Sequence, residues 1–238
     1  MSGVENGSLN QKGKNMKCAR CGETNETKLV ITAMGVFCRK HRTEVQTFWW
    51  SILKFDEYVK ERTRIFSVQD ANKECLNLLW ASNSLGGEVG EFQNMVKKIY
   101  RDFNSKIPDA LKEKMTLELG DQFWYFIFVF DIIDKDPMEV LSSYKLVIEP
   151  DPKYDSIMKI SNAMGARIGK FQDNVDIIYT QADGRINDFM KETLIMNLSQ
   201  FLKMWFLCCM ILDLNPLKVI EKNTDKLKAR YGLKWQNA

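Results

Sequence analysis

Two pairs of acidic residues in this chain have the spacing of helical neighbours. Glu88 and Glu91 are three residues apart, and so are Glu118 and Asp121. Residues at this spacing lie on one face of a helix, so each pair would project from a single face. Oxygen ligands without a histidine among them favour a hard ion, Mg²⁺ or Mn²⁺. We therefore predict a divalent-metal site formed by these four carboxylates.

The neighbours of the acids support this prediction. Asp121 lies just before residues 123–130, FWYFIFVF, a segment that must be buried. Four acids that converge near a core raise the free energy unless cations neutralise them. Gly86, Gly87 and Gly90 thin the first helix beside its acids and would let a neighbour or a ligand approach. Either acid pair alone is more typical of a solvated helix surface, whereas both pairs in this setting favour the metal site.

A second copy of these helices follows later in the chain. Residues 83–100, NSLGGEVGEFQNMVKKIY, align with residues 162–179, NAMGARIGKFQDNVDIIY. At the same offset and without a gap, residues 117–141 align with residues 196–220. A unit of this length is too short to bury its apolar face alone, and two copies packed together as a pseudo-dimer would solve this. We therefore expect an all-α, tandem-repeat helical bundle.

The second copy lacks the acids. In the gapless alignment of the two copies, the four carboxylates are replaced by Arg167, Lys170, Asn197 and Gln200. Because the helices are kept while the acids are lost together, we interpret the acids as chemistry rather than packing. One alternative stays open, in which Arg167 and Lys170 are ion-pair partners of the acids across the bundle.

The elements that would position these residues are helices separated by turn signals. We expect helices at residues 44–65, 68–100 and 110–133, a short one to about residue 148, and a second copy of this plan. Turns are expected at residues 104–109, at Asp136-Pro137, and at the counterparts Asp183-Gly184 and Asn215-Pro216. The final helix contains EKNTDKLKARYG, with Gly232 as its C-cap.

An N-terminal module carries a second set of metal ligands. Cys18-x2-Cys21 and Cys38-x2-His41 are separated by sixteen residues and bracket a stretch that reads as a small β-hairpin. Two ligand pairs at this spacing indicate a structural Zn²⁺ site in which the protein fills all four positions. A redox CxxC pair would not need the second half of the pattern, so zinc is the preferred interpretation.

The zinc module is basic, which suggests two roles. Contact with nucleic acid or a triphosphate is one role. The other, which we favour, is a cap that docks on the bundle and stabilises it. The basic residues are Arg20, Lys28, Arg39, Lys40 and Arg42.

Composition limits the remaining classes of function. The chain has 238 residues, of which 45% are hydrophobic and 27% charged, as in ordinary globular proteins. A diffuse net charge of +3 leaves nucleic-acid binding open but does not favour it. The apolar runs 123–130 and 204–212 are shorter than the roughly 20 residues that span a bilayer, and the polar N-terminal stretch has no secretory signal. Thiols in apolar helices (Cys75, Cys208 and Cys209) suit a reducing compartment, so we expect a cytoplasmic protein without membrane contact.

The combined motifs resemble those of the MazG-like, all-α nucleoside triphosphate pyrophosphohydrolases. The resemblance covers about residues 55–231 and is carried by LGGEVGEF, KKIYRD, ELGDQFWYF, DPMEV and NTDKLKARY. It implies that the four acids hold Mg²⁺ ions that bridge a (deoxy)nucleoside triphosphate. An activated water would attack the α-phosphorus, and the products would be the nucleoside monophosphate and pyrophosphate.

The resemblance also implies substrate-binding roles. By position in the Asn-x-x-Lys-x-x-x-Arg motif of the family, Asn223, Lys226 and Arg230 would contact the nucleotide. A basic last turn that complements the helix dipole explains Lys226 and Arg230 about as well. The basic side chains that could meet phosphate oxygens on the first copy are Lys97, Lys98 and Arg101.

The chain departs from the family because two units are fused. The first unit keeps the acids, and only the second keeps the intact Asn-x-x-Lys-x-x-x-Arg motif, so we expect a composite site. Alternatively, Lys145-Leu146 replaces Lys226-Leu227 after a two-residue slip, and the first unit is self-sufficient. Base recognition is poorly determined, because aromatics at helical spacing are more often core. The aromatic candidates are Trp49, Trp50, Phe55, Tyr58, Trp80 and Trp124.

These observations give one expected function and one alternative. We expect a Mg²⁺-dependent nucleotide pyrophosphohydrolase, with an internal pseudo-dimer that leaves further oligomerisation open. The alternative is a non-catalytic zinc-ribbon helical module that binds nucleotide, nucleic acid or a protein partner. A di-iron centre is set aside, because it would need Glu-x-x-His. The expected divisions are a tail (1–16), a zinc-ribbon-like module (17–43), a unit with the acids (44–150) and a degenerate unit (151–238).

Overall fold

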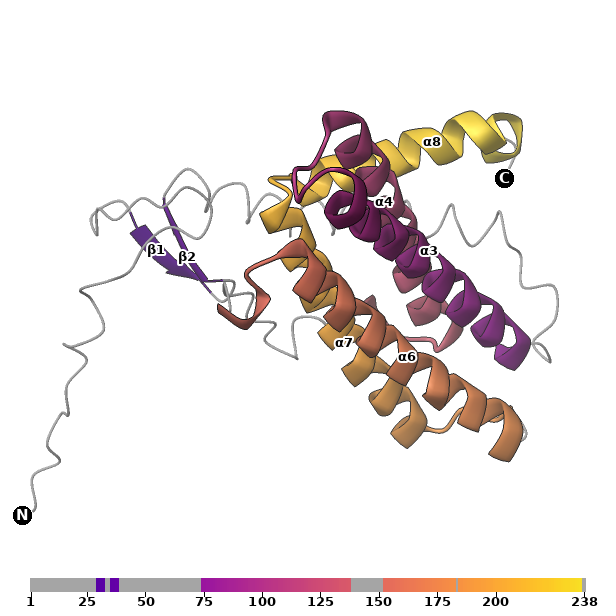
Figure 1. The fold of residues 1–238 in the computed structure, drawn as a ribbon. Helices are drawn as coiled ribbons and strands as arrows, with labels where there is room; N and C mark the ends of the chain where they lie inside the picture. The colour runs from indigo at the N-terminus through magenta and orange to yellow at the C-terminus, as the bar shows by residue number, and fades with distance from the viewer. Residues whose placement is uncertain (1–28, 33–34, 39–73, 138–151, 183, 237–238) are drawn as a thin grey trace, which may run out of the picture.

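The computed structural model describes residues 29–32, 35–38, 74–137, 152–182 and 184–236 (Figure 1). Its larger part is helical: α3 (Glu74–Asp102), α4 (Asp109–Ile132), α6 (Ile157–Gln181), α7 (Asp188–Ile211), α8 (Pro216–Gln236) and the short 3-10 helix η4 (Pro152–Tyr154). The expected all-α class is therefore confirmed for residues 74–137, 152–182 and 184–236. Three expected features lie outside the described residues. They are the helix at 44–65, the break between it and the next helix, and the short helix to about residue 148.

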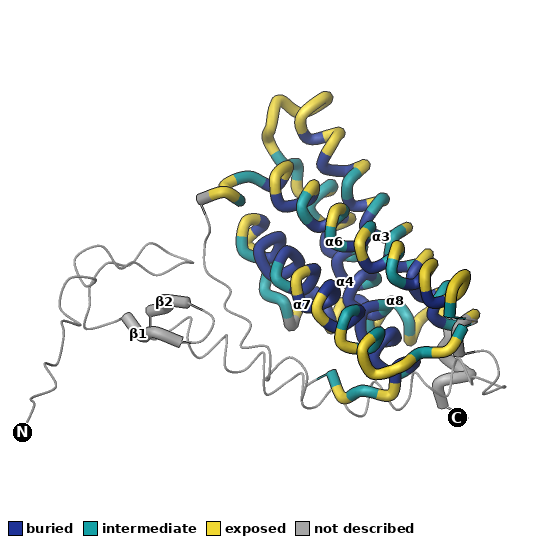
Figure 2. The backbone as a smooth tube through the Cα atoms, turned by 90° about the horizontal axis from the view of Figure 1, so that it is seen from below, coloured by how far each residue is buried: buried dark blue, intermediate teal, exposed yellow. Residues whose placement is uncertain are grey.

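Four helices form a bundle, and α8 packs on one side of it. α3 packs against α4 and α6, α6 packs against α7, and α8 lies against α4 (Figure 1). Apolar residues recur along α3 and α6 at steps of three and four, which places them on the stripe that faces the other helices. The bundle interior is buried, whereas the exposed residues lie on its outer surface (Figure 2). The largest fully buried side chains include Phe92, Phe123, Phe126, Phe130, Phe171, Phe201 and Trp205.

The apolar runs on α4 and α7 lie in this core. Phe126 and Phe201 are fully buried, and their ring centroids are 6.1 Å apart, so the two helices meet inside the bundle. Cys208 and Cys209 are buried free thiols, as the sequence predicts, whereas the side chain of Cys75 lies outside the description. The two expected apolar core segments are confirmed.

Among the described helices, α7 is long and apolar enough, by length and composition, to cross a membrane. The bundle buries 72% of its most apolar window. The run at residues 204–212 thus belongs to a longer apolar helix than we expected from the sequence. Core helices of soluble proteins meet the same test, so the expected absence of membrane contact stays a prediction.

The helices of the two halves have matching boundaries. α4 covers residues 109–132 and α7 covers residues 188–211, so the offset that aligns the two sequence copies also aligns both ends of these helices. The loops before them also match. The amide of Ser105 donates to the carbonyl of Ile99 at 3.0 Å, and the amide of Gly184 donates to the carbonyl of Ile178 at 3.1 Å.

The contact between α3 and α6 is reciprocal. The side-chain amide of Gln93 donates to the carbonyl of Ser161 at 3.0 Å, and that of Gln172 donates to the carbonyl of Ser82 at 3.4 Å. A Cβ atom added at Gly86 would lie 2.4 Å from Nε2 of Gln172. Gly86 therefore admits a neighbouring helix, as the sequence suggests, whereas a Cβ at Gly87 or Gly90 would meet no atom within 4 Å.

The turns follow the sequence signals with one exception. Gly184 adopts a φ of 73° in the loop before α7, and α8 begins at Pro216, directly after Asn215. The expected C-cap at Gly232 is wrong, because α8 continues to Gln236. A glycine inside a helix costs only about 1 kcal/mol relative to alanine. The helical preference of the flanking LKWQ segment therefore suffices to carry the helix past it.

Two short strands lie in the N-terminal region. β1 (Leu29–Thr32) pairs antiparallel with β2 (Gly35–Cys38), and Thr32 stands opposite Gly35 in the register. Cys38 closes β2 opposite Leu29. The other predicted zinc ligands, Cys18, Cys21 and His41, lie outside the described residues, so the zinc site stays a prediction.

Candidate metal centre

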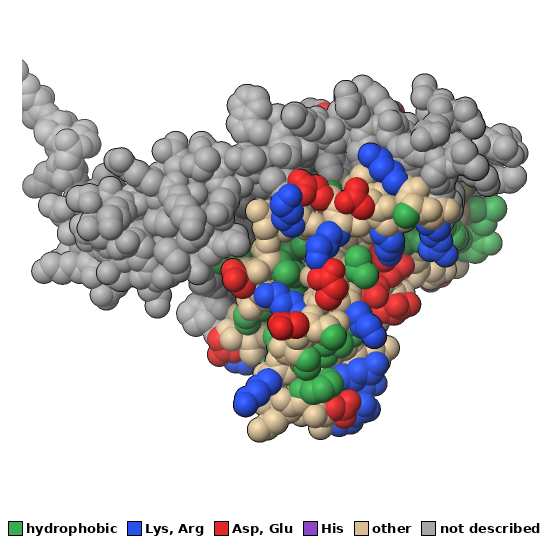
Figure 3. All heavy atoms as spheres, turned by 90° about the horizontal axis from the view of Figure 1, so that it is seen from above, with side chains coloured by type: hydrophobic (Ala, Val, Ile, Leu, Met, Phe, Trp, Pro, Cys, Tyr) green, Lys and Arg blue, Asp and Glu red, His purple; other side chains and the backbone are tan. Residues whose placement is uncertain are grey.

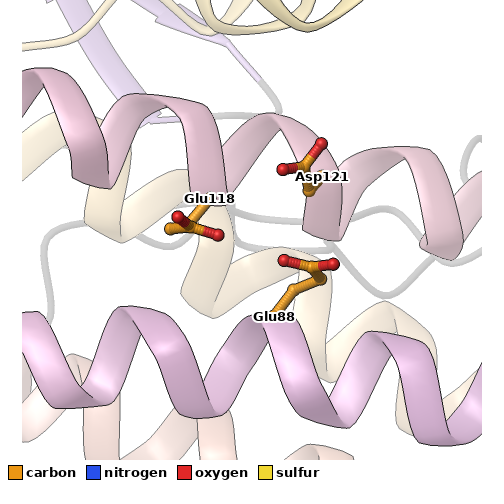
Figure 4. A group of neighbouring side chains, drawn as sticks. All are labelled: Glu88, Glu118 and Asp121. Carbon is orange, nitrogen blue, oxygen red and sulfur yellow. The ribbon is translucent and has the colours of Figure 1, made fainter. Parts of the chain in front are cut away.

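Three of the four predicted acids lie together between α3 and α4. Glu88 projects from α3, and Glu118 and Asp121 project from α4 (Figure 4). Each offers a carboxylate oxygen, and these oxygens all lie within 4.8 Å of one another. All three side chains are half-buried. We call these three residues the acidic triad, and their oxygens could share a single cation.

The triad holds more negative charge than its surroundings neutralise. The pKa of Glu88 rises from its ordinary value of 4.5 to about 8, mainly through burial and then through repulsion by Asp121, a hydrogen bond to Glu118 and repulsion by Glu118 and Glu91. Burial also raises the pKa of Glu118, although the hydrogen bond from Glu88 and the charge of Lys226 oppose this rise. Without another cation, Glu88 therefore keeps its proton near neutral pH and donates it to Glu118.

Glu91, the fourth predicted ligand, lies at the edge of the group. Its side chain is exposed, and it is not among the acids whose oxygens converge. Its charge nevertheless raises the pKa of both Glu88 and Glu118, so it lies within electrostatic reach of them. Glu91 is therefore placed to add charge to the site from its solvent side.

α8 contributes two side chains to the same site. The amide nitrogen of Asn223 donates to Oδ1 of Asp121 at 2.5 Å, and Lys226 forms an ion pair with Oδ2. Asn223 is only 2% exposed, so its hydrogen bond is shielded from water. Two residues that follow the second copy in sequence thus meet an acid of the first copy.

The other predicted substrate-binding residues are not drawn into the triad. Lys97 donates to Asn94 at 3.0 Å, and Arg101 pairs with Asp102 at 2.6 Å, both on the exposed surface of α3. Lys98 is exposed on the same helix. Arg230 is exposed on α8, one turn beyond Lys226. Lys97 lies nine residues from Glu88, which is about 13 Å along a helix.

Two residues that sequence reasoning missed complete the site. Nε2 of Gln122 donates to the backbone carbonyl of Glu88 at 3.2 Å, and this side chain is fully buried. It fixes the turn of α3 that carries Glu88 against α4. A Cβ at Gly120 would lie 2.7 Å from Cβ of Asn223, so α8 can reach Asp121 only beside a glycine. The sequence offered one signal for this close approach, which is the small residue Gly120 between Glu118 and Asp121.

The close approach at Gly120 gives a stability prediction. We expect Gly120→Ala to destabilise the protein by about 1–3 kcal/mol, because the added methyl group overlaps Asn223 and pushes α8 away. Gly87→Ala is the matched control, since its Cβ meets nothing within 4 Å, and we expect it to stabilise by about 0.5 kcal/mol. Urea unfolding of both variants measures the difference. Equal stability of the two variants would contradict the docking described for α8.

The aromatic candidates for base binding divide into two kinds. Trp124 is 7% exposed and stacks on Phe128, so it is a core residue, as the default interpretation expects. Trp80 is 41% exposed and meets the edge of Tyr125, with ring centroids 5.5 Å apart. Tyr125 follows Asp121 by one helical turn. The remaining candidates, Trp49, Trp50, Phe55 and Tyr58, lie outside the described residues.

Charges of both signs are interspersed on the face drawn in Figure 3. Lys222 of α8 pairs with Glu113 of α4 at 2.7 Å, and Lys218 pairs with Glu221 at 2.5 Å. The first of these pairs adds a second polar link between α8 and α4. Exposed pairs of this kind contribute little free energy individually, so Gly120 and Asn223 matter more for docking.

The ion pairing across the bundle that we considered as an alternative is not seen. Within the described part of the chain, neither Arg167 nor Lys170 pairs with any of the four acids. Nε of Arg167 is instead buried without a hydrogen-bond partner.

Comparison with known proteins gives little information. No protein-family model matches the chain. No solved structure matches it either. A 48-residue stretch is 42% identical to the Gene 37 protein of Mycobacterium phage L5, and this stretch is 20% of the chain. The match spans 42% of the phage protein, less than half of its length.

Proposed function

We propose that the protein is a Mg²⁺-dependent nucleotide pyrophosphohydrolase. It would convert a (deoxy)nucleoside triphosphate to the monophosphate and pyrophosphate. The observation that carries the proposal is the acidic triad, in which three half-buried carboxylates converge and Glu88 retains a proton that a cation would displace. The family resemblance of the motifs points to the same chemistry.

The donor set fits Mg²⁺ or Mn²⁺. The ligands are carboxylate oxygens alone, they come from two helices that a buried core holds in place, and their mutual repulsion needs a cation. Glu88, Glu118 and Asp121 would hold the ion, with Glu91 at the edge. A bound divalent ion would supply positive charge for the triphosphate and would lower the pKa of an attacking water.

The surrounding residues hold the acids in place and would contact the substrate. Gln122 holds the turn that carries Glu88, and Asn223 orients Asp121 through its buried hydrogen bond. Lys226 pairs with Asp121, and its ammonium group would turn to a phosphate oxygen once a cation takes over that charge. The other basic residues would contact phosphate only in a substrate that extends along the exposed surfaces of α3 and α8. These residues are Lys97, Lys98, Arg101 and Arg230.

We further propose that the chain is a pseudo-dimer with one composite site. The matching boundaries of α4 and α7 and the reciprocal Gln93 and Gln172 contacts support two units that arose by duplication. The metal ligands would come from the first unit, and Asn223 and Lys226 would come from the helix after the second. The zinc module would be a structural cap on this bundle.

Hydrolysis in ¹⁸O-labelled water tests the proposed reaction. Attack at the α-phosphorus places the label in the nucleoside monophosphate and leaves pyrophosphate unlabelled. Mass spectrometry of the two products distinguishes this outcome from attack at the β- or γ-phosphorus. Label in pyrophosphate or in inorganic phosphate would contradict the proposed reaction.

The raised pKa of Glu88 gives a prediction about metal-free protein. The folded pKa of about 8 exceeds the ordinary value of 4.5, so the folded state holds the extra proton between these values. The stability that protonated Glu88 contributes is therefore fully present below pH 4.5, and this contribution is lost as the pH rises through 8. The full shift corresponds to about 5 kcal/mol, and because the side chain is partly solvated we expect a loss of about 2 kcal/mol.

Urea unfolding in EDTA between pH 5 and pH 8.5 measures this loss. Glu88→Gln should remove most of it, because the variant has no proton to release. Saturating Mg²⁺ should reverse the trend, because the ion binds the ionised carboxylates. A stability of the metal-free protein that does not depend on Glu88 over this range would contradict the electrostatics of the triad.

A further inference from the structure

The second half carries basic residues around the place that corresponds to the acidic triad. In the gapless alignment of the two copies, Arg167 of α6 corresponds to Glu88, and Lys170 corresponds to Glu91. α6 packs against α7 as α3 packs against α4, and α7 has the boundaries of α4 shifted by the same offset. The position of Glu88 is therefore taken in the second half by a half-buried cation, Arg167, with Lys170 exposed beside it.

Within the described residues, Arg167 has no hydrogen bond or ion pair from its side chain. Its side chain is half-buried, and its Nε is buried without a hydrogen bond. A charged group with a buried, unpaired donor is unfavourable, so an anion that binds beside this guanidinium group would offset part of that cost. Lys170 lies three residues further on the same face, and within the described residues it has no ion pair.

Around the corresponding positions, the neighbouring helix α7 adds another cation and no acid. Asn197 and Gln200 of α7 stand at the positions of Glu118 and Asp121, and Lys203 follows Gln200 by three residues on the same face. Nδ2 of Asn197 donates to the carbonyl of Thr193 at 3.1 Å, whereas Gln200 is exposed and available to a ligand. Lys203 also has no ion pair within the described part of the chain.

We propose that Arg167, Lys170 and Lys203 form a binding site for a phosphate-type oxyanion. The guanidinium group presents donors in a planar fork that matches two oxygens of one phosphate, and the two lysines add charge without fixed geometry. Gln200 supplies an amide donor at the rim. The site is separate from the acidic triad, and its binding does not require a divalent ion. It therefore stands whether or not the proposed hydrolysis occurs.

The experiment is calorimetric titration of the full chain with inorganic pyrophosphate in EDTA. Chelation removes the divalent ion that phosphate binding at the acidic triad would need, and the dependence on Arg167 identifies binding at the cationic site. We expect binding to the wild type and to Glu88→Gln alike. Arg167→Gln should weaken binding about tenfold or more, because it removes a charge-assisted bidentate contact.

Two variants control for folding and for general charge. Lys159→Gln removes a cation from the same helix that already pairs with Asp155 at 2.9 Å, and we expect unchanged binding. Arg167→Lys keeps the positive charge but lacks the planar guanidinium group that binds two oxygens, so its affinity for pyrophosphate should be intermediate. A parallel titration with a nucleoside monophosphate tells whether the phosphate source is free or nucleotide-borne. Binding that Arg167→Gln leaves unaltered, or no binding of either ligand by the wild type, would overturn the proposal.

The outcomes separate this inference from the proposed function. Arg167-dependent binding without any nucleotide hydrolysis would leave the oxyanion site and remove the hydrolase proposal. Hydrolysis without Arg167-dependent binding would leave the hydrolase proposal and remove the oxyanion site.

Discussion

Replacing Glu88 by Gln should abolish Mg²⁺-dependent nucleotide hydrolysis. Glu88 is the only member of the acidic triad on α3, and the amide cannot replace the charge that joins the two helices through a cation. Residues that merely support metal ligands commonly change affinity or activity by 10–100-fold, so loss of a ligand should lower kcat/KM by about 100-fold or more. Steady-state kinetics at several Mg²⁺ concentrations measure this effect.

Glu91→Gln is the graded comparison for this prediction. Glu91 is exposed and stands outside the convergent triad, so we expect a smaller loss that higher Mg²⁺ partly restores. Glu113→Gln, which affects an exposed acid of α4 that pairs with Lys222, should leave hydrolysis unchanged. Full activity of Glu88→Gln, or an equal loss in all three variants, would show that the triad is not the metal site.

Lys226→Met should change metal and nucleotide dependence in opposite directions. Lys226 is a cation bound to Asp121, so it competes with a divalent ion for that carboxylate. Its removal should lower the Mg²⁺ concentration needed for half-maximal activity. The same change removes a phosphate-binding charge, so kcat/KM for the nucleotide should fall by about 10–100-fold.

Changing a neighbouring lysine distinguishes the role of Lys226 at the site from a general loss of positive charge on α8. Lys222→Met removes another α8 cation that pairs with Glu113 and does not contact the triad. We expect unaltered Mg²⁺ dependence and unaltered kcat/KM in that variant. If metal and nucleotide affinities fall together in Lys226→Met, the lysine is only a structural link between α8 and α4.

Helical spacing predicted the faces of the acids but not their final arrangement. The i, i+3 pairs placed Glu118 and Asp121 together, and both do lie in the triad. The spacing treated Glu88 and Glu91 alike, yet only Glu88 points between the helices. The distinction depends on the angle at which α4 crosses α3, which is set by packing across the whole core rather than by local sequence.

The role of α8 shows where sequence reasoning stops. The Asn-x-x-Lys pattern identified Asn223 and Lys226, whereas their contact with Asp121 depends on a close approach beside Gly120. Gln122 escaped notice because a glutamine next to an apolar run has no distinctive pattern. Gly232 failed as a helix end because the local signal was weaker than the preference of the residues around it.

Pyrophosphate release from a panel of ribo- and deoxyribonucleoside triphosphates, with wild type and Glu88→Gln side by side, tests the central claim most directly. The acidic triad predicts Mg²⁺-dependent release from at least one nucleotide, with the monophosphate as the second product, and loss of that release in EDTA and in Glu88→Gln. Folded wild-type protein that releases pyrophosphate from none of the nucleotides, or a Glu88→Gln variant as active as the wild type, would contradict the proposed function.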